Sequence, residues 1–86
     1  MKQATDLDRL IGLKVRHHRL RTGISQDCLA NHLGITFQQV QKYERGENRI
    51  SAGRLFEIAV YLQTDLSGFF DGLPKGSLPS QQQFPI

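Results

Sequence analysis

Residues 26–45 read QDCLANHLGITFQQVQKYER, and this stretch decides the fold. It contains two short segments with helical spacing, joined by the tripeptide Gly34-Ile35-Thr36. Helices joined so tightly need a small residue at their closest approach, where Ala30 stands, and a residue tolerant of positive φ at the turn, where Gly34 stands. Five further positions should be apolar to hold the two helices together, and they are Leu29, Leu33, Ile35, Val40 and Tyr43. The stretch therefore predicts a helix-turn-helix.

The boundaries of these two helices are marked by residues that favour helix ends. Ser25 and Thr36 are N-cap residues, which predicts helices over residues 26–33 and 37–45. Gly34 and Gly46 end them.

Helical signals continue on the N-terminal side of this window. A helix is expected from Asp6 to Arg21, begun by a capping box between Thr5 and Asp8 and ended by Thr22-Gly23. One apolar row is formed by Leu7, Ile11 and Val15. A second row, which we expect to contact another neighbour, is formed by Leu10, Leu13 and Leu20.

Two more helices are expected on the C-terminal side. Ser51 caps a helix to about Leu62, whose inner face carries Leu55, Ile58, Ala59 and Leu62. Asp65 caps a short fifth helix, in which Leu66, Phe69 and Phe70 are expected to face the core, with a dimer contact as the alternative for part of this surface. From residue 73 to 86, three prolines and a glutamine run leave no periodicity, which predicts a flexible tail. The fold class is therefore all-α, a compact five-helix bundle over residues 6–72 with a flexible C-terminal tail.

The composition excludes several protein classes. A chain of 86 residues has no room for a Rossmann domain or a β/α barrel. One cysteine cannot form an intramolecular disulfide, no apolar run is long enough to cross a membrane, and no signal peptide is expected. The sequence therefore predicts a cytoplasmic protein.

The net charge of +3 is unevenly distributed and only hints at nucleic acid. Residues 1–21 hold six basic and two acidic side chains, whereas residues 22–46 and 47–62 each hold two of either sign. Residues 63–86 hold one lysine and two aspartates. The whole surplus thus lies in the N-terminal quarter.

With these motifs in place, the sequence resembles the lambda-repressor-like, Cro-type (XRE) helix-turn-helix regulators over about residues 10–72. The resemblance is carried by four motifs, Ile11-Gly12-x-x-Val15-Arg16-x-x-Arg19, Gly23-Ile24-Ser25-Gln26, Leu29-Ala30-x-x-Leu33-Gly34-Ile35-Thr36 and Val40-x-x-Tyr43-Glu44-x-Gly46, followed by Leu55-x-x-x-Ala59-x-x-Leu62. It implies a bundle of about five helices, in agreement with the helices expected above.

The resemblance also implies roles in DNA binding. The helix over residues 37–45 would lie in the major groove, with base contacts from Phe37, Gln38, Gln41 and Lys42. Family members often have a polar residue where Phe37 stands, so packing against protein remains the alternative for this ring. Phosphate contacts would come from Ser25, Gln26, Thr36, Arg45, Asn48 and Arg49, with Arg54 as a further candidate.

Arg19 and Glu44 resemble the family's structural ion pair between the first helix and the end of the third. Each is unfavourable on its own, because Arg19 lies on an otherwise apolar face and Glu44 lies near a helix C-terminus. The presence of each residue is better explained if it forms an ion pair with the other.

Catalysis and metal binding are not expected. Cys28 and His32 share a helical face, but a structural zinc site needs four ligands and the other candidates, His17 and His18, lie on another helix. A nucleophilic pair would need a third orienting group. We expect no catalytic residues, no metal and no cofactor.

The sequence therefore predicts a transcriptional regulator, most simply a repressor, that binds double-stranded DNA as a homodimer on a palindromic operator and is found with the nucleoid when bound. The alternative is an antitoxin or another protein-interaction module with the same fold, which binds a partner protein and DNA only secondarily. The tail could serve such a partner or dock on a second subunit.

Overall fold

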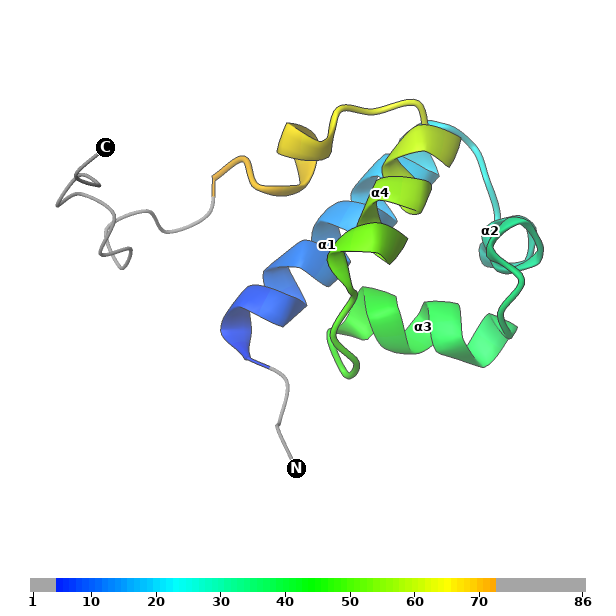
Figure 1. Ribbon diagram of the computed structural model, residues 1–86, viewed down its shortest axis with the longest axis horizontal. Coiled ribbons are helices and arrows are strands. Elements are labelled where there is room, and N and C mark those ends of the chain that lie inside the picture. Colours follow the sequence, from blue (N-terminus) through cyan, green and yellow to red (C-terminus); the bar gives the residue numbers. More distant parts are fainter. Residues whose placement is uncertain (1–4, 73–86) are drawn as a thin grey trace, which may run out of the picture.

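Four α-helices and one turn of 3-10 helix make up residues 5–72, the part of the chain that the computed structural model describes (Figure 1). The α-helices are α1 (Asp6–Arg21), α2 (Gln26–Leu33), α3 (Phe37–Arg45) and α4 (Ala52–Tyr61), and the 3-10 turn is η1 (Leu66–Phe69). The described residues contain no strand, so the all-α prediction is confirmed. The expected tail, residues 73–86, lies outside the described residues.

Each α-helix begins where its capping residue predicts. The side chains of Thr5, Ser25, Thr36 and Ser51 each accept a hydrogen bond from the backbone N–H three residues further along, which is free at the start of a helix. The capping box of Thr5 and Asp8 is complete, because the Asp8 carboxylate accepts from the backbone N–H of Thr5 at 2.8 Å. Gly34 and Gly46 end α2 and α3 in the left-handed conformation, with φ of 71° and 73°.

The core is formed by one side of every element. Its buried members are Val15 of α1, Leu29 and Ala30 of α2, Val40 of α3, Leu55, Ile58 and Ala59 of α4, and Leu62 and Phe69. Of the five apolar positions expected to join α2 to α3, Leu29 and Val40 are fully buried, and Leu33, Ile35 and Tyr43 are half-buried.

The short fifth helix expected after Asp65 is present only as the 3-10 turn η1, so the count of five helices is not confirmed. Residues 66–69 form a 3-10 turn, held by backbone bonds from Gly68 to Asp65 and from Phe70 to Ser67, and the Asp65 side chain makes no capping bond. A single turn directs only one large side chain into the core. That side chain is Phe69, which is fully buried and whose ring centroid lies 5.2 Å from that of His18. Leu66 and Phe70, which we expected to face inward, are exposed.

The two expected apolar rows of α1 are also only partly correct. Val15 is buried and Ile11 is half-buried, but Leu7 at the start of the first row is exposed. In the second row Leu13 and Leu20 are exposed as well. The main packing partners of α1 are α3 and η1, and the side of α1 that carries these leucines faces solvent.

The backbones of α1 and α3 approach each other closely because Gly12 has no side chain. A Cβ atom at this position would lie 2.3 Å from the carbonyl oxygen of Tyr43 and 2.9 Å from that of Glu44. No rotamer change can relieve a contact with backbone atoms. Gly12 therefore sets the distance between α1 and the helix that carries the expected base contacts.

A buried ion pair joins the same two helices. Arg19 Nε donates to Glu44 Oε2 at 2.6 Å, and Arg19 Nη2 donates to Glu44 Oε1 at 3.1 Å, so the pair is bidentate. Both side chains are buried. Arg19 Nη1 also donates to the carbonyl of Ile24, and Gln26 Nε2 donates to Glu44 Oε1 at 3.0 Å, which brings the start of α2 into the same network.

Gly12→Ala is expected to lower the free energy of unfolding by about 1–3 kcal/mol, because the added methyl group overlaps the α3 backbone. Gly53→Ala in α4 is the control, since a Cβ there meets no atom within 4 Å. That substitution should raise stability by about 0.5–1 kcal/mol through the higher helix propensity of alanine. Urea unfolding, monitored by circular dichroism, measures the stability of both variants. Equal changes in stability for the two substitutions would contradict the close approach of the α1 and α3 backbones at Gly12.

Arg19→Met is expected to cost about 3–5 kcal/mol of stability, because it leaves the Glu44 carboxylate buried without its partner. The double variant Arg19→Met, Glu44→Met should recover most of that loss, since it removes both charges. A double-mutant cycle from denaturant unfolding measures the coupling, and additive single effects would show that the two side chains do not stabilise each other.

Candidate nucleic-acid interface

Helix α3 lies across one end of the bundle, below α4 and to the right of the first turn of α1 in the view of Figure 1. At 100° per residue its outward arc is formed by Phe37, Gln38, Gln41, Lys42 and Arg45, while Val40 and Glu44 point to the core. Phe37, Gln38, Lys42 and Arg45 are exposed, and Gln41 is half-buried at the edge of the arc. The four residues expected to contact bases therefore stand on one side of one helix, together with Arg45.

The expected phosphate contacts at the start of α2 have structural roles of their own. The Ser25 hydroxyl caps α2, and the Gln26 amide is held by Glu44 of α3. One N–H of the Gln26 amide is used in this bond, so a second N–H remains for another acceptor. Thr36 similarly caps α3, its hydroxyl accepting from the backbone N–H of Gln39 at 3.0 Å. Ser25 and Thr36 thus fix where α2 and α3 begin, and Gln26 joins the two helices.

The loop from Gly46 to Ile50 is tied to α3 and α1. Asn48 Nδ2 donates to Gln39 Oε1 at 3.4 Å, and Arg49 forms an ion pair with Asp8 of α1. Sequence reasoning assigned Asn48 and Arg49 to the site but did not foresee Gln39 or Asp8. Arg45 is largely free, since its nearest carboxylate, that of Glu47, is 3.9 Å away and both side chains are exposed.

The contacts around Asp8 hold the pKa of its carboxyl group below the ordinary value. The hydrogen bond from Arg49 is the largest cause that lowers the pKa of Asp8, followed by the backbone N–H of Thr5, while burial opposes them. The folded pKa thus lies below the unfolded value. The contacts contribute stability that is fully present above the unfolded pKa and is lost as the pH falls through the folded pKa.

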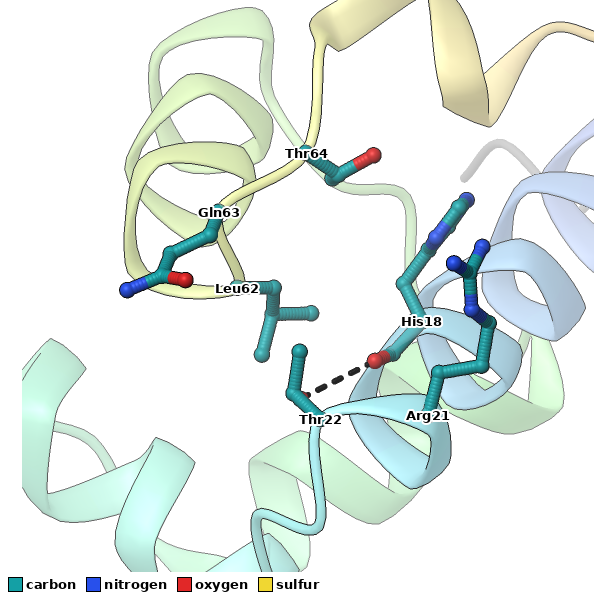
Figure 2. Close-up of a pocket in the computed structure, with 6 residues that line it drawn as sticks. All are labelled: His18, Arg21, Thr22, Leu62, Gln63 and Thr64. Atoms are coloured by element: carbon teal, nitrogen blue, oxygen red, sulfur yellow. Dashed lines mark hydrogen bonds between the residues drawn. The ribbon is translucent and has the colours of Figure 1, made fainter.

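A small pocket lies at the far end of the bundle from α3, between the C-terminal ends of α1 and α4 (Figure 2). Its volume is about 110 Å³, and it is lined by His18, Arg21, Thr22, Leu62, Gln63 and Thr64. The His18 Nε2 atom lies 3.2 Å from the carbonyl of Gly68, and the Thr22 hydroxyl donates to the carbonyl of His18. The His18 side chain therefore joins α1 to η1, whereas the Thr22 hydroxyl satisfies a carbonyl at the end of its own helix.

The other candidate residues singled out from the sequence also lie within residues 5–72. No cluster of three or more His, Cys, Asp or Glu residues suited to a metal occurs among them. Cys28 is exposed, and the His32 ring stacks on Tyr61 at 3.9 Å between centroids. Within the same residues, no helix combines the length and the apolar composition needed to span a membrane.

Known proteins resemble this chain in both sequence and structure. The family model described as helix-turn-helix (HTH_3) matches residues 15–69, well over half of the chain. A transcriptional regulator in the ATPase CF(0) region of Rhodospirillum rubrum is 46% identical over 70 residues, which are 81% of this chain and 65% of the relative. An HTH-type transcriptional regulator of Sinorhizobium medicae is 44% identical over 73 residues, 85% of this chain and 52% of the relative. The chain thus spans about half to two thirds of the lengths of these relatives.

Among solved structures, the restriction-modification controller protein C.AhdI from Aeromonas hydrophila superposes with a TM-score of 0.68. It is 29% identical, and the match covers 76% of this chain and 97% of that protein. The family model, the relatives and this likeness agree with the helix-turn-helix formed by α2 and α3. The chain belongs to the XRE-type helix-turn-helix family of transcriptional regulators.

Proposed function

We propose that this protein binds double-stranded DNA in a sequence-specific manner, with α3 in the major groove. The observation that carries the proposal is the outward arc of α3. Two glutamines and a lysine there offer bidentate donors and acceptors of the kind that distinguish adenine and guanine by their major-groove edges. Phe37, at the first position of the helix, offers its exposed ring edge to a thymine methyl group.

Phosphate contacts flank this arc on both sides. At the start of α2, Ser25 and Gln26 stand beside backbone N–H groups and the positive end of the helix dipole, which favour an anion. Thr36 lies at the turn itself. On the other side, Arg45, Asn48 and Arg49 follow the arc into the loop after α3. Such contacts fix the register of the protein on the duplex and supply salt-dependent affinity.

We further propose that the protein acts as a repressor by occupying a palindromic operator as a homodimer. The relatives described above are transcriptional regulators, which supports regulation over a role as an interaction module. A palindrome matches the two-fold symmetry of a dimer in which each subunit reads a half-site.

The surface that best fits a second copy of the chain is the α4 patch, formed by Phe56 and Val60. These residues lie one turn apart and are 59% and 60% exposed. Their exposed neighbours Ala52 and Gly53 are uncharged, and Glu57 at the edge is paired with Arg54 at 3.1 Å. In Figure 1 no other described element covers the near side of α4.

Charge favours the α4 patch over the other exposed apolar surfaces. A two-fold contact sets a surface against its own copy, so like charges beside the axis repel. Leu13 and Leu20 of α1 stand beside Arg16 and Arg21, whereas Leu66 and Phe70 stand beside Asp65 and Asp71. The charged neighbours of the α4 patch, Arg54 and Glu57, form an ion pair and so add no net charge beside the axis.

Gln38→Ala is expected to reduce discrimination between the preferred duplex and single-base variants by about 1–3 kcal/mol, because a bidentate base contact is lost. The preferred duplex is first selected by the wild-type protein from a random pool. Gln26→Ala is the comparison, and it should weaken binding to preferred and random duplexes alike.

Fluorescence anisotropy titrations at several salt concentrations measure these affinities. The logarithm of the association constant should fall with the logarithm of salt concentration, with a slope near −0.9 per neutralised phosphate. Wild-type protein that selects no sequence, or a flat salt dependence, would overturn the proposed DNA binding. Unchanged selectivity of Gln38→Ala would overturn only the role of that side chain.

Val60→Glu is expected to convert the dimer into a monomer, because it sets two carboxylates against each other at the two-fold axis. Leu13→Glu is the matched control, since Leu13 is also an exposed helical residue, at 56% exposure. Sedimentation equilibrium measures the mass of each variant. A dimer that survives Val60→Glu and is lost in Leu13→Glu would place the interface on α1.

A further inference from the structure

The ion pair between Asp8 and Arg49 stands at the edge of the proposed DNA-binding surface. Arg49 Nε donates to both carboxylate oxygens of Asp8, at 3.2 Å and 3.3 Å, and Arg49 Nη2 donates to Asp8 Oδ2 at 3.2 Å. The two residues are 41 positions apart. They connect the first turn of α1 to the loop that follows α3.

The carboxylate of this pair is held rigidly. Asp8 is 9% exposed, and its Oδ2 atom also accepts from the backbone N–H of Thr5 at 2.8 Å and from the Thr5 hydroxyl at 3.1 Å. Asp8 is therefore anchored by the N-terminal cap of α1 as well as by Arg49. A carboxylate with so many donors cannot turn without losing several hydrogen bonds.

The guanidinium of the pair is held on one edge and open on the other. A guanidinium has five N–H donors in a fixed plane, and Asp8 engages the edge formed by Nε and Nη2. Arg49 Nη1 is in no hydrogen bond within residues 5–72, and the side chain is 48% exposed. A second oxyanion can thus bind the fork formed by Nη1 and Nη2 while Asp8 stays bound.

We propose that Asp8 is a positioning residue for DNA recognition, which orients Arg49 so that its open fork meets one phosphate of the correctly docked duplex. This inference rests on the proposed function. Asp8 also cancels most of the long-range attraction of Arg49 for DNA, because the two charges lie in direct contact. Arg49 then contributes little affinity to non-specific electrostatic binding. Its contribution is largest in the complex in which α3 is correctly docked in the major groove. The pair thereby favours the preferred sequence over random DNA.

The experiment compares affinities for the selected duplex and for a random duplex of equal length. Asp8→Asn keeps the size of the side chain but weakens its hold on Arg49, and it should lower the ratio of the two affinities about tenfold, as expected for loss of one charge-assisted contact. Asp6→Asn is the matched control, because it removes the same charge from the same helical turn. The Asp6 side chain is 97% exposed, and among residues 5–72 it pairs with Arg9. It should leave the ratio unchanged.

A second variant keeps the test independent of any effect of Asp8 on folding. Arg49→Lys preserves the charge but replaces the planar fork with a single ammonium group, which cannot hold Asp8 and a phosphate in the same geometry. It should lower the ratio as Asp8→Asn does. Thermal unfolding of each variant is followed in parallel, so that affinities are compared at a temperature where all are folded.

The outcomes separate this inference from the proposed function. The positioning role is supported if the ratio of affinities for the selected and random duplexes falls in Asp8→Asn and Arg49→Lys but not in Asp6→Asn. Equal ratios in Asp8→Asn and Asp6→Asn, with a wild-type protein that still selects its duplex, overturn the positioning role and leave DNA recognition intact. A wild-type protein that does not bind duplex DNA overturns both.

Discussion

The buried ion pair of Arg19 and Glu44 is the constraint on which the arrangement of the first three helices depends. Two opposite charges that are both withdrawn from water must stay in contact, because either alone would be strongly unfavourable. The pair therefore sets α1 against α3 at one distance and one orientation. Gln26 joins Glu44 from α2, and Gly12 removes the side chain that would otherwise separate the helices. The outward arc of α3, which we propose contacts bases, is thus oriented by contacts on the opposite side of the helix.

Much of the fold could be predicted because the sequence marks its helix boundaries with local signals. Ser25, Gly34, Thr36 and Gly46 determine where α2 and α3 begin and end, and these signals act within four residues of the boundary. The errors arose where the outcome depends on distant neighbours. Leu13 and Phe70 have helical or apolar spacing, but only the packing of α1 and η1 decides that no described element covers them.

The candidate site likewise contains one part that local sequence patterns predict and one part that depends on contacts between distant residues. The outward arc of α3 follows from helical periodicity once Val40 is assigned to the core, so periodicity alone identifies it. The bond between Asp8 and Arg49 spans 41 residues, and Asp8 already had a sufficient local explanation as part of a capping box. Net charge was a weaker guide than position. In the basic N-terminal quarter, Arg19 is neutralised by Glu44. Lys42 and Arg45, the cations on the outward arc of α3, lie in a segment without net charge.

The capping of α3 at both ends has a consequence for the thermodynamics of recognition. A helix of nine residues would be mostly unfolded as an isolated peptide, yet here Thr36 fixes its first turn and Gly46 its last. The conformational entropy of ordering the helix is thus lost during folding, before any duplex arrives, and association carries little of that penalty. A preformed α3 also adapts little to a DNA site that matches it poorly. In the proposed complex, a mismatched site would therefore be accommodated by bending or twisting of the duplex, and sequence-dependent DNA stiffness would contribute to selectivity at base pairs that α3 does not touch.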